Sequence, residues 1–220
     1  MAKVNKQEEI LDNAELQTKS FFTKHSKKII GFLLVAIVAA IGYAGWYFYD
    51  QSLEQDAQAE WAFIQAKYDA QTVDHATLIT EVESFITKHE GTAAANLAHY
   101  YATSSALQLN DLVSATKHIE AFEEVEGEPG AVINAMAKCL KGDIAVEKKQ
   151  YEEAAKLFEE AAAYKNDHTT PYALYKAAVV YQALGNEAKA NELYNSIIEN
   201  YPVEKYPGVA EILNAAKLAQ

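Results

Sequence analysis

A run of 21 residues without a charged side chain, IIGFLLVAIVAAIGYAGWYFY at 29–49, places the strongest constraint on this chain. A helix of that length extends roughly 31 Å, about the thickness of the hydrocarbon core of a bilayer. All faces of such a helix are apolar, whereas a helix on the surface of a soluble core has a polar side. The run therefore predicts a single transmembrane helix over 29–49.

A cleaved signal peptide is the main alternative, because Gly42-Tyr43-Ala44 has the small-x-small form of a cleavage site. Two features favour an anchor that is retained. The charged segment 1–28 is longer than the start of a typical signal peptide, and the aromatic cluster 46–49 follows the cleavage site. Such aromatic rings prefer the headgroup level of a membrane. A lipoprotein anchor is not expected, since no Cys follows the run directly.

The charges on either side of the run predict its orientation. Lys24, Lys27 and Lys28 precede it, whereas several acidic residues and no Lys follow it before Lys67. Because positively charged flanks stay on the cytoplasmic side, we expect residues 1–28 in the cytoplasm and the rest of the chain across the membrane.

Within the run, Ala36, Ala40 and Ala44 stand four residues apart. Small residues at this spacing allow another helix to approach closely, so they predict a docking stripe for a membrane partner. The alternative is the ordinary composition of a transmembrane helix, in which Ala is common.

The charge balance excludes one class of partner. Residues 1–28 contain six Lys and four acidic residues, so positions 29–220 hold the other 13 Lys and 27 acidic residues, a net charge of −14. The chain has no Arg. A domain with this balance repels phosphate groups, and we therefore expect no nucleic acid partner.

The region after the run reads as an array of helical repeats. Its clearest unit spans 171–204, where small residues, aromatic residues, a Gly turn and a closing Pro recur in the order of the 34-residue tetratricopeptide pattern. These positions are Ala178, Tyr181, Gly185, Ala190, Tyr194 and Pro202. Small residues let paired helices cross closely, and Gly185 supplies the left-handed residue of a tight turn.

The same pattern, shifted by 36 residues, predicts a second unit over 135–168 with Gly142 and Phe158 in the small and aromatic positions. A weaker unit is expected over 92–122, with its turn at 109–111, and a degenerate one over 52–90. The stripe 53–68 of that first unit is expected to continue directly from the membrane helix. The acidic stretch 123–130 is expected to form a solvated loop, and 207–218 a cap helix. The predicted fold is all-α: a transmembrane helix followed by a tetratricopeptide-like, right-handed helical solenoid over 50–220.

No residue pattern for chemistry is present. Nucleotide-binding Gly loops, the HExxH zinc motif and the GxSxG nucleophile elbow do not occur, and one Cys cannot form an internal disulfide. We therefore expect no catalytic residues, no metal, no cofactor and no small-molecule substrate. Cys139 is read as a small buried side chain.

The first helix of each repeat pair is expected to line a groove that binds a polypeptide. Tyr and Met suit this role, because they hold varied apolar side chains. The predicted groove residues, taken from the repeat register, are Leu97, Tyr100, Ser104, Met136, Cys139, Asp143, Tyr172, Tyr175 and Val179. The absence of Lys and Arg among them argues against capture of a C-terminal carboxylate.

The order of these parts resembles the YfgM-like family, bacterial inner-membrane tetratricopeptide proteins described as ancillary subunits of the SecYEG translocon. The likeness is carried by KKIIG at 27–31, by IG at 41–42 and WY at 46–47, and by the acidic helix and repeats that follow. The resemblance implies an inner-membrane protein with a periplasmic domain whose partners are the translocon, periplasmic chaperones or exported chains. A scaffold or assembly factor for another cell-envelope complex remains the alternative.

Overall fold

The computed structural model describes the backbone of residues 2–68 and 74–219, and the side chains of these residues except 2–31, 33 and 129. The chain divides into two compact units, Met1–Leu53 and Glu54–Gln220. Helix α1 (Ala2–Tyr68) makes up the first unit and continues into the second. The helix predicted over 53–68 is therefore continuous with the residues that precede it.

From Phe32 to Tyr49, the described side chains of α1 are uncharged and exposed. The large apolar side chains between Phe32 and Leu53 whose surroundings are described are all at least 40% exposed, and Ala36, Ala40 and Ala44 are exposed as well. Among the described residues, no helix combines the length and the apolar content that a membrane crossing requires. The span predicted at 29–49 lies partly outside that set, because the side chains of 29–31 and 33 are not described.

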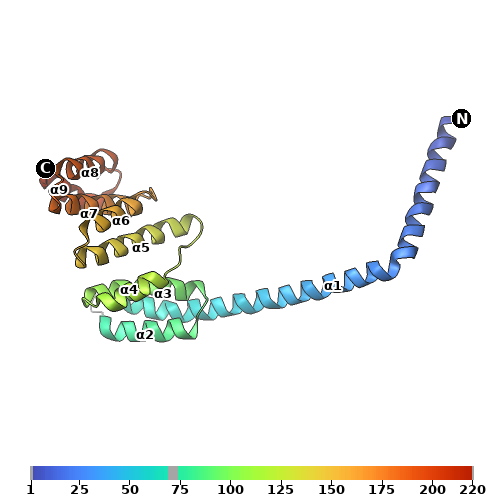
Figure 1. Ribbon diagram of the computed structural model, residues 1–220, viewed down its shortest axis with the longest axis horizontal. Helices are drawn as coiled ribbons and strands as arrows, with labels where there is room; N and C mark the ends of the chain where they lie inside the picture. The colour runs from blue at the N-terminus through green and yellow to red at the C-terminus, as the bar shows by residue number, and fades with distance from the viewer. Residues whose placement is uncertain (1, 69–73, 220) are drawn as a thin grey trace. The chain divides into compact units, whose positions relative to one another are not determined.

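The second unit is built from helices alone in the part that the structure describes, as the all-α prediction required (Figure 1). Neighbouring helices in the chain pack against each other, and α3 also contacts α5. After the end of α1 these helices are α2 (His75–Lys88), α3 (Ala93–Gln108), α4 (Leu112–Ala121), α5 (Glu128–Glu147), α6 (Tyr151–Ala162), α7 (Thr170–Ala183), α8 (Glu187–Asn200), the 3-10 turn η1 (Pro207–Val209) and α9 (Ala210–Leu218).

Polar side chains fix where several helices begin. Asp74, Thr92, Asp111 and Asn186 each accept a hydrogen bond from a backbone N–H in the first turn of the helix that follows. These groups satisfy donors that have no partner inside the helix. The carboxylate of Glu54 also accepts from the backbone N–H of Ala93 at 2.7 Å, so the part of α1 that begins the second unit is fastened to the start of α3.

The tight turns between paired helices use left-handed residues. Gly185 has φ +74°, as its place in the repeat predicted. Asn110, in the turn predicted at 109–111, has φ 56°. In the unit predicted over 135–168 the equivalent position is Lys149, which takes φ 59° although a side chain disfavours this region.

Buried side chains form three clusters along the array. Trp61 and other residues of α1 pack with α2 and α3, and the Trp61 ring lies 5.3 Å from that of Phe85. A small cluster around Ile119 and Ile144 joins α3 and α4 to α5. The largest cluster, around Phe158 and Tyr194, holds α5 to α9 together. Helix α3 contributes to the first and second of these clusters, and α5 contributes to the second and third. Successive clusters are thus joined through a shared helix.

The acidic loop is shorter than predicted. The stretch 123–130 was expected to form a loop, but α5 already begins at Glu128. The loop that remains is held at both ends by Asn side chains. Asn96 pairs with the backbone N–H and C=O of Glu123, both at 2.8 Å. Asn134 pairs in the same way with Val125, both at 2.9 Å.

Candidate functional site

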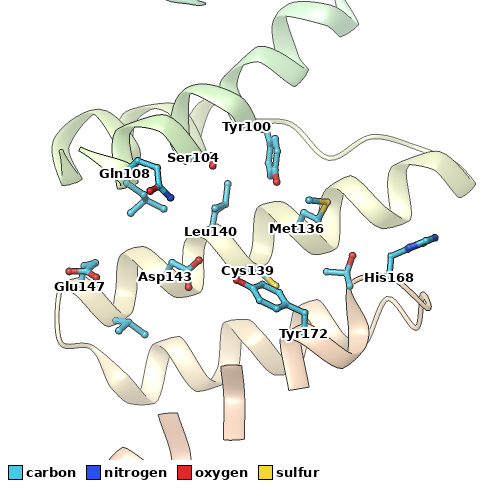
Figure 2. A pocket seen from close by; sticks show the side chains of 13 residues that line it. Tyr100, Ser104, Gln108, Met136, Cys139, Leu140, Asp143, Glu147, His168 and Tyr172 are labelled. Atoms are coloured by element: carbon cyan, nitrogen blue, oxygen red, sulfur yellow. The ribbon is translucent and has the colours of Figure 1, made fainter. Parts of the chain in front are cut away.

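A cavity of about 560 Å³ opens between α3, α5 and the start of α7, and we call it the groove (Figure 2). These three helices are the first members of consecutive pairs, so equivalent faces of the repeat meet here. The groove is lined by Tyr100, Ser104, Leu107, Gln108, Met136, Cys139, Leu140, Asp143, Val146, Glu147, His168, Thr169 and Tyr172. Its volume falls in the range of sites that hold a few side chains or a small ligand.

Six of the nine predicted groove residues line this cavity: Tyr100, Ser104, Met136, Cys139, Asp143 and Tyr172. The other three do not. Leu97 packs against the cluster around Trp61. Tyr175 packs against the largest core cluster. Val179 is 42% exposed but lies outside the lining.

Several lining residues were missed by the sequence reasoning. Gln108 and Glu147 stand four residues after Ser104 and Asp143, and the same i,i+4 spacing along α3 and α5 would have found them. His168 and Thr169 precede α7 and carry no helical spacing signal. Their presence in the groove follows from the turn that brings the chain into α7.

Aromatic and thioether side chains gather between the middle of α5 and the start of α7. Figure 2 shows Tyr100 on α3 facing Met136 on α5, with Tyr172 of α7 below them. Met136 and Tyr172 are 38% and 43% exposed, so much of their apolar surface has no protein neighbour. Burial raises the pKa of Tyr100 well above its ordinary value, which keeps its hydroxyl protonated as a hydrogen-bond donor. This end of the groove is suited to an apolar side chain.

One ion pair lies at the groove. Lys176 of α7 donates to the carboxylate of Asp143 on α5 at 2.5 Å, and its ammonium lies 4.7 Å from the centre of the Tyr172 ring. Burial alone would lower the pKa of Lys176, but the Asp143 carboxylate raises it. Burial raises the pKa of Asp143 even with Lys176 beside it. The pair spans the interface between two successive repeats.

The thiol of Cys139 is 3% exposed. Burial raises its pKa to about 12, with Lys176 opposing that shift. The thiol is therefore protonated at neutral pH and acts as an apolar part of the wall. Within the described ranges, no group of three or more His, Cys, Asp or Glu is placed to hold a metal ion.

Comparison with known families agrees with the repeat architecture. Residues 19–122 match the family described as a tetratricopeptide repeat-like domain, and residues 172–202 match the family described as a tetratricopeptide repeat. No curated protein and no solved structure matches the chain. The chain therefore contains tetratricopeptide-like repeats, which are modules for protein–protein interaction. Neither match identifies the YfgM-like family, so that resemblance stays a prediction.

Proposed function

We propose that this protein is a membrane-anchored scaffold that holds segments of other polypeptides in the groove between α3, α5 and α7. The observation that carries the proposal is the lining itself. Side chains from three consecutive repeats converge on one open cavity, and Tyr, Met and Leu side chains are among those that line it. Such a surface accommodates varied sequences, because it relies on burial of apolar area and a few polar contacts.

The anchor belongs to the same proposal. The uncharged run at 29–49 is long enough to cross a bilayer, and the Lys residues before it favour a cytoplasmic N-terminus. The acidic repeats then act on the other side of the membrane. Because α1 continues into the second unit, no loop separates the anchor from the first repeat helix.

The resemblance to YfgM-like proteins supplies the partner that we propose. In that reading the protein is an ancillary subunit of the SecYEG translocon in the bacterial inner membrane, or an adaptor for periplasmic chaperones. Its periplasmic repeats hold exported chains as they emerge. Ala36, Ala40 and Ala44 offer a face on which a helix of a membrane partner can dock.

Site-specific photo-cross-linking in the full-length protein in cells tests the partner. A cross-linker replaces Met136 or Tyr172 in the groove, and the matched control replaces Val113, which is 82% exposed on α4. We expect both groove positions to capture exported chains, SecY or a periplasmic chaperone, and the control to capture none of them. Equal labelling from Val113 would refute a groove-specific interaction. Capture of outer-membrane or cell-division components alone would favour the alternative of an assembly factor for another envelope complex.

Membrane fractionation tests the anchor independently. We expect the protein to stay with membranes in alkaline carbonate and to dissolve only in detergent. Protease added after permeabilisation of the outer membrane should digest the repeats, while a tag placed before residue 28 should be protected. Release by carbonate would contradict the anchor and leave the groove experiment unaffected.

A further inference from the structure

The junction between α4 and α5 is packed sparsely. α4 packs on α5 less extensively than α3 packs on α4 or α5 packs on α6. The buried cluster at this junction is the smallest of the three in the array, and Ala106, Ala115 and Ala137 are half of its buried residues. Little apolar surface therefore holds the two sides together. We call residues 54–122 the first half of the array and 128–219 the second half.

Polar contacts add little to the junction. The ion pairs among the described residues lie within one half or the other, as that of Lys138 with Glu160 does. The ammonium of Lys148, directly after α5, donates to the hydroxyl of Thr116 on α4 at 2.9 Å, but this contact is exposed. Water competes for an exposed hydrogen bond, so this contact restrains the two halves only weakly.

The loop between α4 and α5 is attached to both halves. Asn96 of the first half holds the backbone of Glu123, and Asn134 of the second half holds the backbone of Val125. The attachment therefore changes from one half to the other at Glu124. Hinges in proteins are a few loop residues that absorb changes in φ and ψ between two rigid bodies. Glu124 occupies such a position.

Two cavities flank the junction and leave room for movement. The groove is one of them, and its walls come from different halves: Tyr100 and Gln108 belong to the first, whereas Met136 belongs to the second. The other cavity, of about 300 Å³, lies on another face of α5, where Ile119 of α4 and Ile144 of α5 line it. Any bending between the halves must change the width of the groove.

We infer that the array bends at Glu124 and that this movement widens and narrows the groove. The two halves move as rigid bodies, because each is held internally by a larger cluster and by its own ion pairs. Bending exposes little apolar surface, since alanines make up half of the buried cluster that it disturbs. The groove thereby adjusts to segments of different bulk. The inference concerns the fold and does not depend on which polypeptide the groove holds.

Double electron–electron resonance on the purified full-length protein in detergent tests the hinge. Spin labels are attached to cysteines at exposed positions in a Cys139→Ala background. The pair Ser84→Cys on α2 with Glu152→Cys on α6 spans the junction. One control joins the Ser84 label to Val113→Cys within the first half, and the other joins the Glu152 label to Glu199→Cys within the second. We expect the spanning pair to give a distance distribution about twice as wide as either control, because a hinge adds rigid-body movement to the spread of the labels. Equal widths in all three pairs would overturn the inference.

A further pair tests whether the groove takes part. Gln108→Cys and His168→Cys place labels on exposed residues that line the groove from different halves. We expect this pair to be wider than the controls as well. A narrow distribution here, beside a wide one for the spanning pair, would mean that bending leaves the groove unchanged, and the inference would be wrong.

A substitution at the junction separates a hinge from general loosening. Thr116→Ala removes the hydroxyl to which Lys148 donates, so it should widen the distribution of the spanning pair further. Thr87→Ala is the matched control: each of these hydroxyls donates to the backbone carbonyl four residues earlier, but Thr87 lies within the first half. The control should leave the distribution unchanged. An equal effect of both variants would indicate loosening of the first half and would overturn the hinge.

Discussion

The ammonium of Lys176 lies 2.5 Å from the carboxylate of Asp143, across the interface between α7 and α5. Their side chains are 20% and 29% exposed, so both charges are largely removed from water. Phe158, from the helix between them in the chain, lies under the same ammonium at 5.5 Å. The pair thus joins two successive repeats at the wall of the groove and leaves Asp143 partly neutralised there.

Removal of one partner of this pair should destabilise the second unit. Lys176→Met leaves the Asp143 carboxylate without its counter-charge, and we expect a loss of about 1–3 kcal/mol in the free energy of unfolding. Urea denaturation followed by circular dichroism measures it. The double variant Lys176→Met with Asp143→Leu should recover part of the loss, because no unpaired charge remains. The single variant Asp143→Leu completes the comparison. If the loss in the double variant equals the sum of the losses in the two single variants, Lys176 and Asp143 are not coupled.

The absence of a side chain at Gly142 is required by Phe158. A Cβ added at this glycine would lie 2.5 Å from Cε1 of the Phe158 ring, which is only 1% exposed. In an exposed helix, Gly→Ala stabilises by about 1 kcal/mol. Here we expect Gly142→Ala to destabilise by about 1–3 kcal/mol, because the ring must shift in a packed core. Thermal unfolding of Gly142→Ala, Phe158→Leu and the double variant measures the coupling; a stabilised Gly142→Ala would contradict the contact.

A second pair of titratable groups lies between α3 and α4. The Nδ1 atoms of His99 and His118 are 3.1 Å apart, so one ring donates a hydrogen and the other accepts it. His118 is 2% exposed, with Nε2 3.4 Å from the carboxylate of Glu83, to which Lys117 also donates at 2.8 Å. Burial lowers the pKa of both histidines; the neighbouring charges of His118 and Lys117 lower that of His99 further, while Glu83 and Asp111 oppose the shift of His118.

This pair predicts a loss of stability in mild acid. The ordinary histidine pKa is 6.5, and the pKa values of His99 and His118 are below it in the folded state. Between the lowered values and 6.5, the unfolded chain therefore binds more protons than the folded chain. The stability that the neutral histidines contribute is fully present above their ordinary pKa. It is lost as the pH falls through the lowered pKa values of His99 and His118. Urea denaturation between about pH 7.5 and about pH 5.5 stays above the ordinary pKa values of Asp and Glu. The double variant His99→Gln with His118→Gln should show a flatter dependence on pH; an unchanged slope would assign it to other groups.

The positions of the turns could be predicted from the repeat register, but the residue used at each turn could not. Gly185 marks its own turn, because glycine is the usual left-handed residue. Lys149 adopts the same left-handed conformation at the equivalent position. A lysine has no intrinsic preference for this conformation, so the sequence does not identify it as the turn residue. The start of α5 was missed for a related reason. In the sequence, Gly127 and Glu128 belong to the stretch predicted as a loop. Only the structure shows that the loop ends at Gly127 and that the first turn of α5 begins at Glu128.

The groove residues likewise fall into those that the repeat register predicts and those that it does not. Tyr100, Met136 and Tyr172 occupy equivalent places in consecutive repeats, so the helical register was sufficient to bring them together. Tyr175 and Val179 follow the same register on α7 but lie outside the groove. After α7 the array continues with α8 and the cap helix α9, and α9 packs on α7. The cavity reaches only the beginning of α7, because Tyr172 is the last residue that lines it. Where an array ends is a property of the tertiary fold that helical spacing does not contain.

The loop between α4 and α5 should depend on Asn134. This side chain is 6% exposed and satisfies both the backbone N–H and the C=O of Val125, as a neighbouring strand would. Asn134→Ala leaves those groups without that partner, and we expect a loss of about 1–3 kcal/mol with faster amide exchange at Val125. Asn134→Asp keeps the acceptor but sets a negative charge against the carbonyl, so it should be no better than Asn134→Ala. The matched change Asn96→Ala, at the exposed end of the loop, should cost less. Amide exchange at Val125 that is unchanged in Asn134→Ala would show that the loop is held by other contacts.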